Sequence, residues 1–257
     1  MLEAGNFWGA VVAAGLMATS AFANNLSPNP CPTASLASYE VDYSSPTVGA
    51  PDGPCSNGIL NFSDFTFSSS GAPAGLLLSS SQITLTPDGP PLGEEGDTGF
   101  DISGMSIGSG ETATYVIDWF FNIDAGPIAG GASLGMDPPF GDVTITQEYC
   151  VDSYLSAYGI AGSPFCYGGS GATQPSVQSL SVTSTPGDES ASILFNPVAY
   201  DFADVRTIIE LNGTEGPGGF DNTTGGSTIL APEPAAFLLI PVPLLIAFLR
   251  RRRALAL

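Results

Sequence analysis

Carboxylates are the side chains of this sequence that could do acid–base chemistry. The chain contains no histidine and no lysine. This excludes Ser-His-Asp and Cys-His nucleophiles, Schiff-base chemistry and the P-loop. Two acids such as Asp118 and Glu148 could form a glycosidase pair, but sequence spacing does not select them. Glu148 lies near Cys150, where a structural hydrogen bond is the expected role, so we predict a non-enzymatic protein with a secreted carboxylate hydrolase as an alternative.

The densest group of acids could bind a cation. It comprises Asp88, Glu94, Glu95, Asp97 and Asp101. Carboxylate oxygens are ligands that Ca²⁺ prefers, although the spacing here is not that of an EF-hand. A solvated surface is the favoured interpretation. We therefore expect no cofactor, with a structural Ca²⁺ in this loop as the alternative.

Aromatic residues gather near the two C-terminal cysteines. Tyr154, Tyr158, Phe165 and Tyr167 lie within or next to the segment 150–166. Exposed rings at one site could stack against sugars, whereas core packing is the more common use of such residues. A carbohydrate-binding module that uses this loop is therefore an alternative function.

The charge balance limits the partners. The formal net charge is −20, although four of the five basic residues form the run Arg250, Arg251, Arg252 and Arg253. The rest of the chain contains one base, Arg206, and is more acidic still. Such a surface repels phosphate backbones, so we exclude nucleic acid as a partner.

The four cysteines predict two disulfides if the chain reaches an oxidising compartment. Four cysteines allow three connectivities. We favour Cys31 with Cys55 and Cys150 with Cys166, because each pair flanks a turn-rich stretch. Zinc binding is disfavoured, because the sequence has neither CxxC nor histidine.

The N-terminus predicts export. An apolar stretch over 7–17 leads to Ala21 and Ala23, the small-x-small pattern that signal peptidase accepts. We expect a signal peptide over 1–23, with cleavage after Ala23.

The C-terminus combines three features. Pro232, Glu233 and Pro234 are followed by an apolar segment over 235–249 and by the arginines at 250–253. The segment is shorter than the roughly 20 residues that cross a bilayer comfortably. Arginine clusters stay on the cytoplasmic side. We expect transient insertion in the inner membrane, with the body outside and the arginines as a stop-transfer signal.

This tail, over 231–257, resembles the PEP-CTERM sorting signal of exported bacterial proteins. The resemblance implies that an exosortase, a membrane protease-transpeptidase, recognises Pro232, Glu233 and Pro234 and removes the tail. It also implies a hydrophobic sorting helix, delivery to the cell surface or the extracellular space, and an association with exopolysaccharide and biofilm. A plain tail anchor is the alternative.

Strand patterns recur through the body, between turns rich in Gly and Pro. The predicted strands are 36–43, 59–67, 76–86, 112–123, 142–151, 177–184, 190–196 and 205–212. The stretch 112–123 alternates, with Tyr115, Ile117, Trp119, Phe121 and Ile123 on one face and Val116, Asp118, Phe120 and Asn122 on the other. The segments 86–99 and 125–139 are predicted to be connectors.

These patterns predict an all-β protein, an antiparallel β-sandwich of jelly-roll or Ig type. The predicted ectodomain spans 24–211 and is followed by a Gly/Ser/Thr-rich spacer over 212–230. The leading hypothesis is an exported surface or matrix protein that associates with extracellular polysaccharide.

Overall fold

The computed structural model describes residues 27, 29–48, 50–72, 77–89, 98–123, 128–159, 164–168, 176–184, 188–213, 217–222 and 228–229. The predicted signal peptide with its cleavage site at Ala23, the motif Pro232–Pro234, the segment 235–249 and the arginines at 250–253 lie outside these residues. The described part of the chain is an antiparallel β-sandwich with two disulfides, as the sequence predicted.

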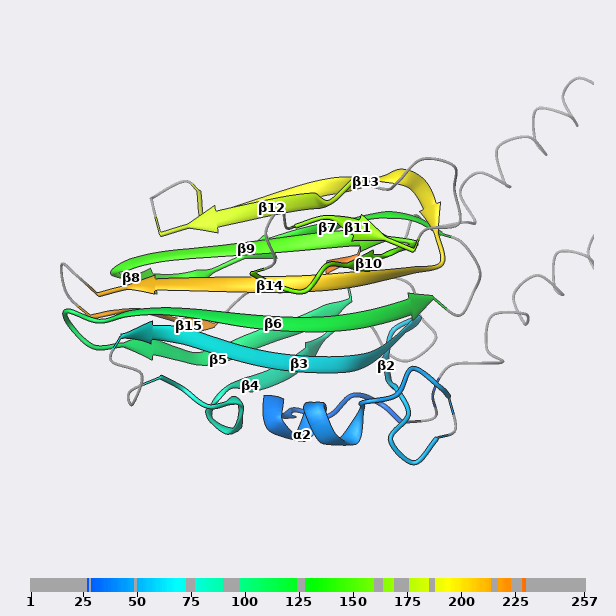
Figure 1. Ribbon diagram of the computed structural model, residues 1–257, viewed down its shortest axis with the longest axis horizontal. Helices are drawn as coiled ribbons and strands as arrows, with labels where there is room; N and C mark the ends of the chain where they lie inside the picture. The colour runs from blue at the N-terminus through cyan, green and yellow to red at the C-terminus, as the bar shows by residue number, and fades with distance from the viewer. Residues whose placement is uncertain are drawn as a thin grey trace, which may run out of the picture.

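A six-stranded antiparallel sheet forms the front layer (Figure 1). Its strands, in spatial order, are β12 (Gln178–Thr183), β9 (Asp142–Val151), β14 (Phe202–Asn212), β6 (Thr112–Ile123), β3 (Leu60–Ala72) and β2 (Cys55–Asn57). β14 pairs with β6 along its whole length on one side and with β9 from Ala203 to Asn212 on the other. It is therefore a central strand of this sheet.

Two smaller sheets lie behind it (Figure 1). The five-stranded sheet consists of β1 (Ala34–Ser35), β4 (Thr84–Asp88), β5 (Gly99–Ile107), β15 (Gly218–Asn222) and β8 (Asp137–Phe140). The three-stranded sheet consists of β13 (Ser190–Tyr200), β7 (Ile128–Gly135) and β16 (Thr228–Ile229). A separate hairpin pairs β10 (Tyr154–Leu155) with β11 (Cys166–Tyr167).

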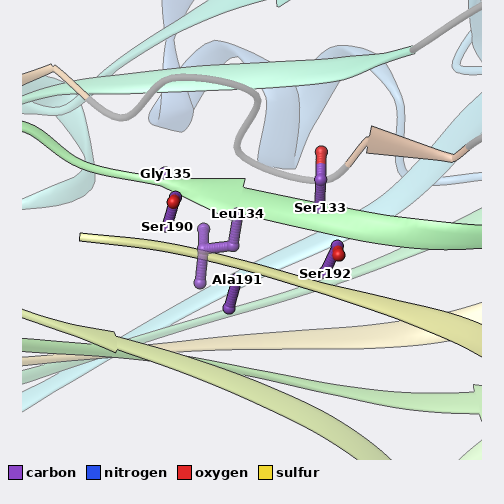
Figure 2. A pocket seen from close by; sticks show the side chains of 6 residues that line it. All are labelled: Ser133, Leu134, Gly135, Ser190, Ala191 and Ser192. Atoms are coloured by element: carbon purple, nitrogen blue, oxygen red, sulfur yellow. The ribbon is translucent and has the colours of Figure 1, made fainter. Parts of the chain in front are cut away.

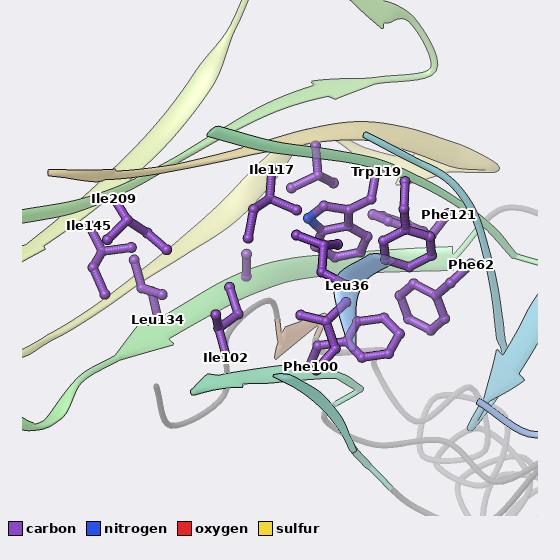
Figure 3. Packing of buried hydrophobic residues seen from close by; sticks show 14 of the residues in the cluster. Leu36, Phe62, Phe100, Ile102, Ile117, Trp119, Phe121, Leu134, Ile145 and Ile209 are labelled. Atoms are coloured by element: carbon purple, nitrogen blue, oxygen red, sulfur yellow. The ribbon is translucent and has the colours of Figure 1, made fainter. Parts of the chain in front are cut away.

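One apolar core joins the layers (Figure 3). The inward face of β6 is the face that the alternation predicted, and its members are buried: Tyr115, Ile117, Trp119, Phe121 and Ile123. The Trp119 ring meets the Phe100 ring of β5 edge-on, with centroids 6.0 Å apart. Phe62 of β3 also contacts Phe100, with centroids 4.9 Å apart. Such edge-to-face aromatic packing ties the front sheet to the back sheet.

A bulge in β3 keeps two aromatic residues inside. The pairing with β6 shifts between Ser63 and Thr66, and Asp64 adopts a positive φ of 56°. The added residue reverses the inward–outward alternation. Phe62 before the bulge and Phe65 after it are both buried as a result.

One predicted strand is a helix. Residues 36–43 were expected to be extended, but α2 (Leu36–Asp42) occupies them. Ser35 caps the helix, because its hydroxyl accepts a hydrogen bond from the Ser38 N–H at 3.3 Å. The spacing of Leu36 and Tyr39, both fully buried, places them on one helix face against the core. Capping and tertiary packing outweigh the β propensity of the segment.

The structure also extends the predicted strands 59–67, 190–196 and 205–212 and contains β5, which was not predicted. Larger differences concern three other predicted segments. In the predicted strand 76–86, a short 3₁₀ turn, η3 (Ser80–Gln82), precedes β4. The predicted connector 125–139 contains β7 and most of β8. The predicted spacer 212–230 contains β15 and β16, which pair with strands of the back layer. Parts of this glycine-rich region therefore belong to the sandwich.

Candidate functional site

The outer face of the front sheet brings ionisable residues together at its centre. Arg206 of β14 is directly opposite Asp118 of β6 and also opposite Glu148 of β9. Asp204, two residues earlier in β14, shares this face because side chains alternate along a strand. It is opposite Phe120 of β6. The pairing register of β6, β14 and β9 therefore brings together ionisable residues that lie far apart in the sequence.

The β10–β11 hairpin lies over this part of the sheet, where β10 contacts both β9 and β14 (Figure 1). The disulfide Cys150–Cys166 joins the hairpin to β9. The Leu155 N–H donates a hydrogen bond to Asp204 Oδ2 at 2.9 Å. These two attachments, one covalent and one polar, hold the start and the end of the hairpin on the sheet.

Arg206 joins the hairpin to the sheet at a third point. Its Nε donates to Asp118 Oδ1 at 2.7 Å, and its Nη1 lies 3.5 Å from Glu148 Oε2. Its Nη2 donates to the Ser156 carbonyl oxygen at 2.7 Å. The guanidinium carbon also lies 5.6 Å from the centroid of the Tyr158 ring, a cation–π distance. Arg206 itself is only 2% exposed.

Aromatic rings lie beside this centre, five of them linked ring to ring and the sixth, Tyr158, linked to them through Arg206. We call this group the aromatic platform, and its members are Phe120, Tyr154, Tyr158, Phe165, Tyr167 and Phe202. Four of these rings are exposed, Tyr154 by 43%, Tyr158 by 47%, Phe165 by 40% and Tyr167 by 48%. The four residues singled out from the sequence therefore do lie at the surface.

The rings of the platform form a connected row. Phe120 and Tyr154 are nearly parallel, with centroids 6.3 Å apart and an interplanar angle of 17°. Tyr154 and Tyr167 are 6.0 Å apart and tilted by 39°. Phe165 and Tyr167 are 6.4 Å apart and tilted by 58°. The row is thus contiguous, but its rings are tilted against one another and not coplanar.

Burial governs the ionisation of the acids beneath the platform. Burial raises the pKa of Asp118 and the pKa of Glu148, and the positive charge of Arg206 offsets part of this effect. Burial also raises the pKa of Asp204 to about 6, against the opposing hydrogen bond from the Leu155 N–H. Desolvation disfavours the charged form of each carboxyl group.

The two acids considered for hydrolysis, Asp118 and Glu148, are brought together by the fold. Both are bound to Arg206, and the structural contact expected for Glu148 is present. The cysteine pairs that the sequence favoured, Cys31–Cys55 and Cys150–Cys166, are both formed.

The acidic loop is described only in part. Asp88 ends β4 and Asp101 lies in β5, with Asp101 opposite Thr86. Glu94, Glu95 and Asp97 lie outside the described residues. Within the ranges that the structure describes, no three His, Cys, Asp or Glu side chains gather in a way that could hold a metal ion.

A second surface feature is a hollow of about 420 Å³ that is lined by residues of the paired strands β7 and β13 (Figure 2). Its lining residues are Ser133, Leu134, Gly135, Ser190, Ala191 and Ser192. The lining offers hydroxyl groups but neither a charge nor an aromatic ring, so it has little to orient a ligand.

Sequence reasoning did not assign Phe120, Phe202, Asp204 or Arg206 to a site. Two signals were present. Phe120 is an aromatic residue on the face of β6 that carries Asp118 and Asn122, where a polar surface is expected. Arg206 is the one base before the terminal arginines, in a strand of otherwise ordinary pattern.

The described residues contain no helix that is both long and apolar enough to span a membrane.

No protein-family model matches the chain, and no curated protein matches it. Among solved structures, that of TmCBM61 in complex with β-1,4-galactotriose is similar to this chain, with 15% identity and a TM-score of 0.31. The similarity covers 65% of this chain and 88% of that one. A similarity of this size does not place the chain in a family.

Proposed function

We propose that this protein binds carbohydrate through the aromatic platform and carries no catalytic activity. The main support for this proposal is the contiguous row of exposed rings, which a disulfide and Arg206 hold on the sheet. The C–H face of a pyranose is apolar, and an exposed aromatic ring offers it a flat partner. Adjacent carboxylates and carbonyl groups can accept hydrogen bonds from sugar hydroxyl groups. The tilt between neighbouring rings suits a single, twisted polysaccharide chain better than a flat crystalline surface.

Removal of one exposed ring tests this proposal. We expect Tyr167→Ala to weaken binding about tenfold, because the row loses a central stacking partner. The measurement is affinity gel electrophoresis of the full-length protein in gels that contain a soluble neutral β-glucan or alginate. Leu194→Ala is the matched control, since Leu194 is 77% exposed and lies in β13, outside the platform. The proposal fails if no polysaccharide retards the native protein, or if both variants migrate like it.

We further propose that the protein is exported and acts at the cell surface or in the extracellular matrix. Two disulfides are typical of proteins that reach an oxidising compartment. The resemblance of the C-terminus to a PEP-CTERM signal supports release by an exosortase-type enzyme after transient membrane insertion. A platform on the released body would then retain the protein among extracellular polysaccharide chains.

Peptide mapping by mass spectrometry tests the route of export. We expect the native protein from the cell surface or medium to end near Pro232–Pro234 and to lack Arg250–Arg253. A membrane-bound protein that retains the arginines in every fraction would instead show that the tail is an anchor.

A further inference from the structure

The platform has no cation to offer a ligand. Arg206 is the one basic residue before position 250, so no other side chain of the body can carry a positive charge. Its guanidinium is buried and already bound to Asp118, Glu148 and the Ser156 carbonyl oxygen, with Tyr158 over its face. An acidic sugar would therefore find no partner for its charge.

The groups around the rings are acidic instead. The Asp118 side chain remains 31% exposed beside the guanidinium. Asp201 is exposed where β13 meets β14, and its N–H donates to Asp152 Oδ1 at 2.8 Å. Asp204 lies in the same region, under the start of the hairpin. Together these carboxylates outnumber the single positive charge, and the local field is negative.

We propose that the platform selects uncharged polysaccharide and rejects polyanionic chains such as polyuronates. This inference rests on the proposed carbohydrate binding. A neutral sugar can stack on the rings and donate its hydroxyl hydrogens to carboxylates, and hydrogen bonds to a charged acceptor are the stronger ones. A uronate at the same position would bring like charges together with no compensating cation, which costs binding free energy.

Salt dependence separates the two ligand classes. We expect the native protein to bind a soluble neutral β-glucan with an affinity that changes less than about twofold between about 50 mM and about 500 mM salt. We expect alginate to bind at least about tenfold more weakly at the lower salt, and the difference to narrow as salt screens the repulsion. Alginate binding that equals or exceeds glucan binding at low salt would overturn the inference.

A pair of charge variants locates the effect. Asp201→Asn removes an exposed negative charge next to the platform, and we expect it to raise alginate affinity without changing glucan affinity. Glu210→Gln removes an exposed charge near the far end of β14 and should change neither. Equal effects of the two variants would overturn the local origin of the selectivity. Failure of every polysaccharide to bind refutes the proposed function itself, whereas strong alginate binding refutes only the selectivity.

Discussion

Replacement of Arg206 by methionine is expected to destabilise the protein by about 3–5 kcal/mol. Methionine keeps much of the apolar volume but removes the partner of Asp118, of Glu148 and of the Ser156 carbonyl oxygen. The Glu148 side chain is only 11% exposed, so water cannot fully replace the guanidinium. Urea unfolding followed by circular dichroism measures the change in the free energy of unfolding.

Neutralisation of the partners provides the control. In the triple variant Arg206→Met, Asp118→Asn and Glu148→Gln, no buried charge is left without a partner. We expect this variant to regain a large part of the lost stability, because removal of all members of a buried ionic group costs less than removal of one. A single variant that loses less than about 1 kcal/mol would show that Arg206 is not the structural centre of this face.

The second large effect concerns pH and Asp204. Burial raises the pKa of this carboxyl group to about 6, so the folded protein holds the proton more tightly than the unfolded chain does. Stability should therefore fall as pH rises from about 4 to about 6 and level off above that range. The contribution of Asp204 is on the order of 2 kcal/mol. The raised pKa values of Asp118 and Glu148 act in the same direction.

Asp204→Asn tests the origin of this dependence. The amide oxygen can still accept a hydrogen bond from the Leu155 N–H, but the group no longer titrates. We expect the variant to lose most of the difference in unfolding free energy between pH 4 and pH 7, as measured by urea unfolding at each pH. Asp201→Asn, at an exposed site, should leave the difference intact. An unchanged pH dependence in the Asp204 variant would refute the assignment.

The strands that were predicted most accurately are those with a clear alternation of apolar and polar residues, because this alternation shows which face of the strand is buried. β6 and β9 were predicted with their observed bounds, because alternation between core and surface fixes which side chains must be apolar. β7 was predicted as a connector because it is rich in glycine. The structure supplies the reason: a Cβ on Gly131 would collide with the Ile193 carbonyl oxygen of the neighbouring β13. Close approach of two backbones, and not a turn, requires this glycine.

Only the part of the site that is formed by residues close together in the sequence could be predicted. Tyr154, Tyr158, Phe165 and Tyr167 lie close together in the sequence, and the disulfide that gathers them joins nearby cysteines. The rest of the site joins β14 to strands that precede it by more than fifty residues, as in the contact between Arg206 and Asp118. Its composition depends on which strands pair and in which register, and a single sequence does not specify that pairing.

The position of β14 imposes an order on assembly as the chain is synthesised. This strand comes late in the chain, yet it stands between β6 and β9 in the front sheet. Until β14 has emerged, the front sheet consists of two separate parts with open edges. One part contains β2, β3 and β6, and the other contains β9 and β12. Open edges favour pairing with other chains. A nascent chain therefore presents these edges until residue 212 is free, whereas the two disulfides, which close only short loops, can form before then.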